Sequence, residues 1–251
     1  MKSVVILIDF DNYFGTDASK INPEEMELSF KEMVRLCENE FSDFSSILIR
    51  LYGGWHKETI LTNFASQVQQ LLSQVIVFPK VSSNKVLNGS IELATSLHIK
   101  PDFIWNYTYK ETNGVSSVKR IRINHECIDT HCTNSKNNCP KYILYKFTDK
   151  RDRECPVQGC NNLQKDVFKG AQQKMVDTLF ACDIISASED ESINGMLIIS
   201  DDQDHLPSLA LASIKKKDNL KSIILGIKNE QVNDFVSVFM EPFNIKTAIV
   251  S

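Results

Sequence analysis

Short, mostly apolar runs recur along this chain and stop abruptly at polar or turn-forming residues. They cover residues 4–8, 47–54, 75–78, 196–200 and 222–227. Runs of this length and composition predict strands that are buried on both faces. Such strands are typical of a parallel sheet covered by helices on either side.

Between these runs, apolar residues recur at steps of three and four, which is the helical period. Residues 23–40 predict an amphipathic helix, because Asn22 is a good N-cap, a proline follows it and acidic residues fill the first turn. Helical patterns also cover residues 59–72, 168–187 and 206–216. This alternation predicts an α/β fold with a parallel sheet and right-handed crossovers.

The pattern changes between residues 110 and 163, where Gly, Asn, Ser, Thr and Cys replace the apolar periodicity. Two β-like stretches, residues 117–123 and 142–147, lie within this polar segment. Structureless loops of such length are rare in compact domains. We therefore expect an inserted module of β-structure, after which the α/β pattern resumes.

Composition and charge are those of an ordinary globular protein. The hydrophobic fraction is 42% over 251 residues, and the net charge of −4 does not by itself indicate nucleic-acid binding. Residues 110–170 are locally basic, however, with twelve Lys and Arg against seven acidic residues. No apolar run approaches the ~20 residues of a membrane-spanning helix. The first run is also too short for a secretory leader, so we expect a cytoplasmic protein without membrane contact.

Aspartates follow two of the apolar runs and open a third block. Asp9 and Asp11 follow the first run, Asp202 and Asp204 follow the fourth, and Asp177 begins a helical pattern. Ligands of open α/β sheets bind beyond the carboxyl ends of the strands. Carboxylates gathered there repel one another unless a cation lies among them, and Mg²⁺ or Mn²⁺ is the usual one. The pattern predicts a metal-dependent hydrolase, with a ribonuclease as the first candidate.

Helical spacing places Asp177 on the same face as Ala181, Ile184 and Ile185. A carboxylate on a core-facing stripe is costly to bury unless it is paired or metal-bound. Asp183 lies a turn and a half later, and we expect it to face elsewhere in a supporting role. Taken singly, each of these aspartates is also compatible with a helix cap or a strand-end turn.

Three sequence blocks carry a family resemblance. Residues 8–12 are IDFDN, residues 173–177 are QKMVD with another Asp six positions later, and residues 197–207 are LIISDDQDHLP. In order and position these blocks resemble the metal-binding motifs of the NYN family, the PIN-like nucleases. The resemblance covers residues 1–105 and 165–227. It implies a PIN-like parallel sheet flanked by helices, and RNA phosphodiester hydrolysis assisted by one or two Mg²⁺ or Mn²⁺ ions.

The resemblance also implies roles for single residues. The four acids that the family uses are the expected ligands of the catalytic metal: Asp9, Asp177, Asp202 and Asp204. Asn12 would orient Asp9 or the substrate, and Ser200 would assist. The chain departs from the family at Asp201 and Met175, where glycines are usual, and at His205, where an aromatic residue is usual. The two replaced glycines support a rival interpretation, a non-catalytic RNA-binding protein that keeps the fold.

A third interpretation starts from Asp9-Phe10-Asp11, which is similar to the opening motif of the haloacid-dehalogenase-type phosphohydrolases. In that class the first Asp is a nucleophile and the second a general acid. Asp201 and Asp202 would then form the late Mg²⁺ site. Tyr13 does not fit the small hydroxyl pattern of that class, and Asp177 has no role in it.

Five cysteines lie within the predicted module, at spacings that are moderately specific for a structural zinc site. One Zn²⁺ held by four of them would fold a segment too small and polar to hold itself together. His125 and His131 are alternative ligands, and reduced thiols or redox disulfides are alternative states. The five are Cys127, Cys132, Cys139, Cys155 and Cys160.

Basic residues interleaved with tyrosines surround these cysteines and can track a phosphate backbone. We expect four arginines to guide RNA toward the acidic pocket, although a solvated β-hairpin surface has the same composition: Arg120, Arg122, Arg151 and Arg153. The predicted organisation is a nuclease domain made of residues 1–110 and 164–251, interrupted by a zinc-binding module at residues 111–163.

Overall fold

The computed structural model describes residues 2–82, 85–106, 108–113, 139–148, 152–220 and 222–250. The chain divides into two compact units. The first consists of Met1–Tyr109 and Gln173–Ser251, and the second of Lys110–Gln172. The predicted β-like stretch at residues 117–123 lies outside the described residues.

Seven strands form the main sheet of the first unit, and all neighbours in it are parallel except β5 and β6. Their order across the sheet is β13-β12-β11-β1-β2-β6-β5. The predicted α/β fold with a parallel sheet is therefore confirmed. The strands are β1 (Ser3–Asp9), β2 (Ser46–Tyr52), β5 (Lys80–Ser82), β6 (Lys85–Leu93), β11 (Ile193–Ile199), β12 (Ser222–Ile227) and β13 (Lys246–Ile249).

Two cores cover the two faces of this sheet. Val4, Ile6 and Ile8 of β1 enter the first core, whereas Val5 and Leu7 enter the second. Because side chains alternate along a strand and both faces are covered, these strands appear in the sequence as unbroken apolar runs. The first core packs under α2 (Pro23–Glu40) and α3 (Asn63–Leu72), and the second under α6 (Val176–Glu189), α7 (Leu206–Lys215) and α8 (Glu230–Met240).

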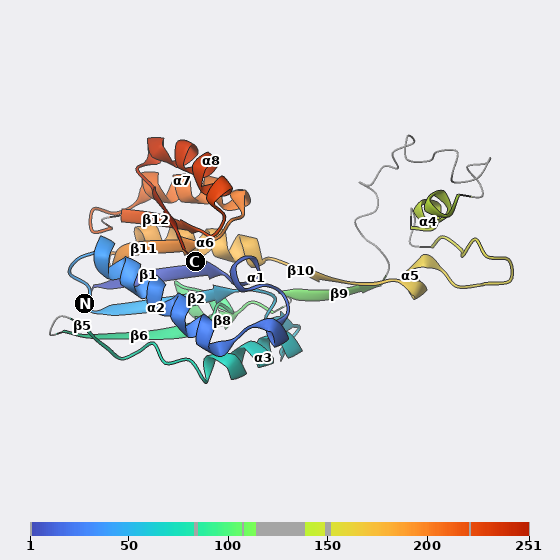
Figure 1. The fold of residues 1–251 in the computed structure, drawn as a ribbon, viewed down its shortest axis with the longest axis horizontal. Helices are drawn as coiled ribbons and strands as arrows, with labels where there is room; N and C mark the ends of the chain where they lie inside the picture. The colour runs from blue at the N-terminus through green and yellow to red at the C-terminus, as the bar shows by residue number, and fades with distance from the viewer. Residues whose placement is uncertain are drawn as a thin grey trace. The chain divides into compact units, whose positions relative to one another are not determined.

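The helix α2 has the predicted bounds and lies across its face of the sheet (Figure 1). Local signals explain this agreement. The side chain of Asn22 accepts a hydrogen bond from the backbone N–H of Glu24 at 2.9 Å, which satisfies one of the free donors of the first turn. Met26, Phe30 and Met33 are fully buried on the apolar stripe.

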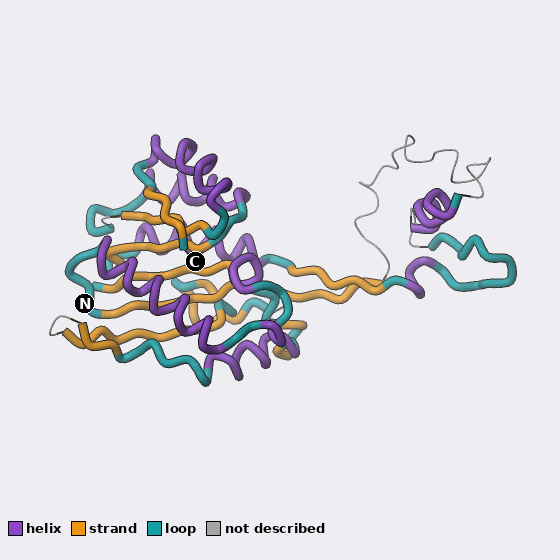
Figure 2. The backbone as a smooth tube through the Cα atoms, viewed as in Figure 1, coloured by secondary structure: helices purple, strands orange, loops and turns teal. Residues whose placement is uncertain are grey.

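Shorter elements complete both units. The first unit contains α1 (Phe10–Phe14), the antiparallel pairs β3 (His56–Lys57) with β4 (Ile60–Leu61) and β7 (Ser96–Leu97) with β8 (Lys100–Ile104), and three 3-10 helices, η1 (Ala18–Lys20), η6 (Gln203–His205) and η7 (Glu241–Phe243). The strands β9 (Tyr109–Asn113) and β10 (Lys169–Gln173) run side by side (Figure 2), and α4 (Pro140–Thr148) and α5 (Gln164–Val167) belong to the second unit. None of the helices in the described ranges combines the length and apolar character that crossing a bilayer requires.

The strand predicted at residues 75–78 is wrong. The backbone N–H of Ile76 donates to the Glu27 carboxylate on α2 at 2.8 Å, so this segment is bonded to a helix rather than to a strand. The sixth strand in sequence, β6, takes the place beside β2. The helix expected from residue 59 begins only at Asn63, because Thr62 caps it by accepting from the N–H of Ala65 at 3.1 Å.

Two further predictions are corrected around the second unit. Residues 168–187 do not form one helix: β10 comes first and α6 begins at Val176. Met175 separates them with a left-handed backbone, φ 61°, a conformation that favours glycine. Residues 142–147 lie in the helix α4 rather than in a strand. Aromatic residues satisfy either structure in so short a stretch, and periodicity alone does not distinguish them.

Candidate functional site

The carboxyl ends of β1 and β11 form the topological switch point of the sheet. The two strands are neighbours, with Ile8 opposite Ile199. Yet β2 lies on the far side of β1 and β12 on the far side of β11, so the chain leaves the two strands in opposite directions. Doubly wound sheets bind ligands in the crevice at such a point. Asp9 ends β1 and Ser200 directly follows β11, so the predicted acidic residues lie at this place.

Asp9 is held from two sides. Its Oδ1 accepts a hydrogen bond from the backbone N–H of Asn12 at 3.3 Å, which makes Asp9 the N-cap of α1. Its Oδ2 accepts from the Ser200 hydroxyl at 3.2 Å, across to the neighbouring strand. The Asp9 side chain is only 17% exposed. The carboxylate is therefore positioned and largely withdrawn from water.

The loop after β11 is ordered by its own polar side chains. The Ser200 hydroxyl accepts from the N–H of Asp202 at 3.0 Å, and Asp202 Oδ1 accepts from the N–H of Asp204 at 2.9 Å. Asp201 differs from these neighbours, because its Oδ1 accepts from the N–H of Lys228 at 2.7 Å, beyond the end of β12. Asp201 thus joins the ends of β11 and β12.

Asn12 has a different contact from those expected. Its side-chain carbonyl accepts from the backbone N–H of Asp201 at 2.9 Å, so the side chain joins α1 to the loop after β11. Only its backbone reaches Asp9. Asn12 therefore orders the site through the backbone of the acidic loop.

Asp177 lies in the first turn of α6 and is exposed rather than buried. The predicted core-facing position of Asp177 is wrong: the stripe that α6 buries includes Ile184, as predicted, but it continues through Leu179 and Phe180 rather than through Asp177. Desolvation by neighbouring atoms raises the pKa of Asp177 most, His205 lowers it, and the charges of Asp9, Asp202 and Asp204 raise it further. The structure therefore brings the four predicted ligands into one electrostatic neighbourhood.

Asp11 is a fifth acid of this neighbourhood and, like Asp9, follows the first apolar run of the sequence. Burial, together with the charge of Asp9, raises its pKa from 3.8 to about 6, and a hydrogen bond from Gln173 opposes that rise. Gln173 donates to Asp11 Oδ2. The buried Oδ1 has no hydrogen-bond partner in the described part of the chain.

His205 also lies beside the acidic residues, at a position where the sequence pattern indicated only a replaced aromatic residue. Its imidazole is nearly buried, and Nε2 lies 3.7 Å from Asp9 Oδ2. The ring packs edge-on against Phe180, with 4.5 Å between centroids. The spacing between Asp9 and His205 in the sequence carries no signal of this contact.

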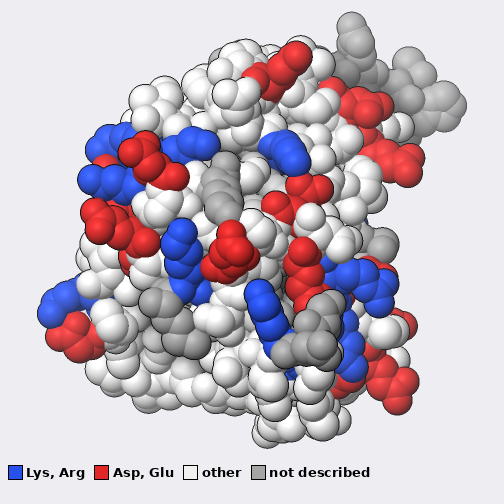
Figure 3. Space-filling model, turned by 90° about the vertical axis from the view of Figure 1, so that its left-hand side faces the viewer, with Lys and Arg blue, Asp and Glu red and all other residues white. Residues whose placement is uncertain are grey.

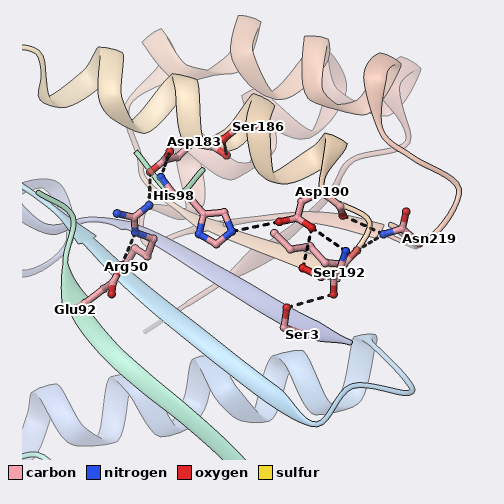
Figure 4. Close-up of polar contacts among 10 residues, drawn as sticks. Ser3, Arg50, Glu92, His98, Asp183, Ser186, Asp190, Ser192 and Asn219 are labelled. Atoms are coloured by element: carbon pink, nitrogen blue, oxygen red, sulfur yellow. Dashed lines mark hydrogen bonds and ion pairs between the residues drawn. The ribbon is translucent and has the colours of Figure 1, made fainter. Parts of the chain in front are cut away.

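Asp183, which the sequence predicts to face away from the core-facing stripe, is instead completely buried. Its Oδ2 accepts hydrogen bonds from Arg50 and from the Tyr52 hydroxyl, both at 2.7 Å, and its Oδ1 accepts from the N–H of His98 at 2.8 Å. Figure 4 shows Arg50 between Asp183 on α6 and Glu92 on β6. Burial raises the pKa of Asp183, and the charge of Arg50 opposes that effect. This cluster ties α6, and with it Asp177, to β2.

At the amino ends of the strands, charged side chains are not gathered by sign as they are around Asp9. There acidic and basic side chains are interspersed over the surface (Figure 3). Ion pairs such as Lys80 with Glu38 and Lys246 with Glu40 neutralise them locally. Like-charged groups gather instead around Asp9, at the opposite ends of the strands.

Within the described residues, no group of three or more His, Cys, Asp and Glu side chains is placed to hold a metal ion. The donor chemistry nevertheless fits Mg²⁺, which keeps several waters and needs only one or two protein carboxylates besides substrate phosphates. The buried Asp11 Oδ1 without a partner fits the same interpretation.

The predicted zinc and RNA-guiding residues are only partly described. Cys127, Cys132, Arg120, Arg122 and Arg151 lie outside the described residues, whereas Cys139 is buried and Arg153 is exposed. Cys155 and Cys160 lie in a turn closed by the Cys155 N–H, which donates to the Asn162 carbonyl at 2.9 Å. The backbone N–H of Asn162 and the Cys155 thiol lower the pKa of Cys160.

Trp55 is a packing residue. It is fully buried, stacks on Phe64 with 5.9 Å between centroids, and donates from Nε1 to the Leu51 carbonyl at 2.8 Å. Trp55 therefore belongs to the first core rather than to the candidate site.

Comparison of the chain with protein-family models, curated proteins and solved structures finds no match.

Proposed function

We propose that this protein is a metal-dependent ribonuclease with a PIN-like (NYN) fold, built around a Mg²⁺ or Mn²⁺ site at the carboxyl ends of β1 and β11. The proposal rests on the placement of Asp9 and of the acidic loop after β11 at adjacent carboxyl ends of strands, where burial raises the pKa of Asp177 most and the charges of Asp9, Asp202 and Asp204 add to that rise. Carboxylates brought together in this way repel one another, and a divalent cation relieves the repulsion.

The residues of the site have distinct tasks in this proposal. Asp9, Asp177, Asp202 and Asp204 would be the ligands of the ion, directly or through its waters, and the ion would supply an activated water for in-line attack on phosphorus and stabilise the leaving oxygen. Ser200 fixes Asp9 through its hydroxyl hydrogen bond. Asn12 fixes the acidic loop through the N–H of Asp201.

The second unit provides the RNA contacts and a structural zinc in the same proposal. A lowered pKa favours the thiolate form of Cys160, which is the form that binds Zn²⁺. Arg153 is exposed and able to reach a phosphate backbone. The remaining proposed ligands and arginines are those named from the sequence.

The test is RNA cleavage by the purified protein in the presence of Mg²⁺ or Mn²⁺. We expect cleavage by the wild type, loss with EDTA, and recovery when Mg²⁺ is added back. Asp9→Asn should abolish cleavage. The matched control is Asp102→Asn, since Asp102 is exposed on β8 and pairs only with Lys100 among the interactions described. Equal cleavage by wild type and Asp9→Asn would show that this site does not perform the reaction.

One observation favours a second function. Asp11, with a pKa of about 6 beside Asp9, has the properties of a general acid next to a carboxylate nucleophile. A phosphohydrolase would therefore release phosphate from small phosphomonoesters and leave RNA intact. Binding of RNA without hydrolysis of either substrate would indicate the non-catalytic RNA-binding alternative.

A further inference from the structure

Lys228 places a positive charge beside the acidic loop. It directly follows β12, and its backbone N–H donates to Asp201 Oδ1 at 2.7 Å. Its ammonium group donates to the Tyr13 carbonyl of α1 at 3.2 Å and lies 5.0 Å from the centre of the Tyr13 ring. Asn12 joins the same helix to the N–H of Asp201. Lys228 is therefore fixed at the carboxyl ends of the strands by α1 and by the loop after β11.

The groups that hold the Lys228 ammonium do not neutralise its charge. Within the described residues, Lys228 forms no ion pair, and the Tyr13 carbonyl is the one acceptor of its side chain. Lys215, in contrast, pairs with Glu189 at 3.3 Å. A carbonyl and an aromatic face orient an ammonium but carry no net charge. Because an ammonium has three N–H donors and Lys228 is exposed, two donors remain available to a ligand.

We propose that Lys228 binds a phosphate of the RNA backbone and thereby positions the strand over the acidic residues. The inference rests on the proposed ribonuclease function and adds a substrate contact to the same site. Its chemical basis is that a lysine ammonium binds phosphate oxygens as a point charge. The neighbouring carboxylates repel a polyanion, and a fixed cation beside them offsets this repulsion. A polynucleotide offers Lys228 a phosphate besides the one that reacts, whereas a phosphomonoester does not.

The test measures the binding of a fluorescein-labelled oligouridylate to the full-length protein by fluorescence anisotropy. EDTA prevents cleavage, and the concentration of KCl is varied. Lys228→Gln should weaken binding about fivefold at low salt and reduce the slope of log affinity against log salt by about 0.7, the value for one phosphate contact to a single strand. The variant keeps the bond to Asp201, because that bond uses the backbone N–H.

A second readout uses RNA cleavage in Mg²⁺. Lys228→Gln should raise KM and leave kcat nearly unchanged, because a contact to a phosphate that does not react binds the ground state and the transition state equally. Lys228→Arg keeps the charge and should restore both the salt slope and KM.

Lys215→Gln is the matched control, because it removes one positive charge from a partly exposed lysine whose partner is Glu189. It should keep the affinity and the slope. Circular dichroism verifies folding, and Lys228→Met is a second neutral variant if Lys228→Gln folds poorly. An unchanged slope in a folded neutral variant, or an equal loss in Lys215→Gln, would overturn the role of Lys228.

These results separate the two proposals. If RNA is cleaved in a metal-dependent reaction and the neutral variants keep the salt slope, only the role of Lys228 is wrong. If the neutral variants lose the contact and RNA stays intact in Mg²⁺ and Mn²⁺, the role of Lys228 stands and the ribonuclease proposal is wrong. Failure of the wild type to bind or cleave RNA in either condition would overturn both.

Discussion

The pKa of Asp11 responds to its burial and to the negative charge of the neighbouring Asp9. The side chain is partly buried in α1, and desolvation with the nearby Asp9 charge raises its pKa to about 6. The Gln173 hydrogen bond offsets this rise only in part. Perturbed carboxyl groups of this kind cluster at functional sites, where a cation or a proton transfer makes use of them.

The raised pKa predicts a pH dependence of stability. The folded protein binds the Asp11 proton more tightly than the unfolded chain, so the contribution of Asp11 to the free energy of unfolding falls as pH rises from 3.8 to about 6. Asp11→Asn lacks this loss. The free energy of unfolding of Asp11→Asn minus that of the wild type should therefore increase as pH rises across that window. Urea denaturation without divalent metal, at a series of pH values, measures it.

Parallel stability profiles for Asp11→Asn and wild type would contradict the raised pKa. Asp102→Asn is the control for the removal of one negative charge. Its carboxylate is exposed, and its profile should follow that of the wild type throughout.

At the scale of elements, the orientation of α6 depends on a buried ion pair. Asp183 is completely buried, and Arg50 on β2 is 2% exposed. The Tyr52 hydroxyl and the N–H of His98 complete the bonding of the carboxylate. Breaking a buried pair from one side leaves the other charge without compensation. The same helix carries Asp177, so its attachment to β2 also positions the site.

Asp183→Asn should therefore lower the free energy of unfolding by about 3–5 kcal/mol, the usual cost of removing one partner of a buried pair. Glu92→Gln is the control, because Glu92 pairs with the same Arg50 at 2.9 Å but is 47% exposed. That change should cost about 1 kcal/mol or less. Urea denaturation gives both values. An equal cost for the two variants would show that burial of Asp183 does not anchor α6.

For the whole molecule, the sheet order determines where charge accumulates. From β1 the chain continues to β2 on one side of the sheet, and from β11 it continues to β12 on the other side. The loops that follow β1 and β11 carry the acidic residues. Folding therefore brings like charges together that the unfolded chain keeps apart. This repulsion lowers the stability of the folded protein.

Binding of a dication should raise the stability of the folded protein. At a Mg²⁺ or Mn²⁺ concentration one hundred times Kd, the free energy of unfolding should increase by about 2.7 kcal/mol. Asp9→Asn should show little of this gain. A monovalent salt at equal ionic strength is the control, because it only screens the charges. An equal gain in that salt would contradict specific binding of the ion.

Local signals in the sequence predicted much of the fold. Asn22 and the residues after it define α2, because a helix cap and an apolar stripe act within a few residues. The run before Asp9 identified β1, because burial on both faces leaves an unbroken apolar pattern. The strand prediction for residues 75–78 was wrong because the backbone of Ile76 bonds to Glu27, a partner 49 positions away.

The sequence by itself determined that apolar strands end at Asp9 and near Asp202, since a strand and its end are local properties. Only the tertiary structure decided which acids are buried, because packing sets how α6 is turned. It buries Asp183 against Arg50 and leaves Asp177 exposed. It also brings His205 to Asp9 across 196 positions of the chain, by making β1 and β11 neighbours. Such contacts arise from strand order, which no spacing of residues encodes.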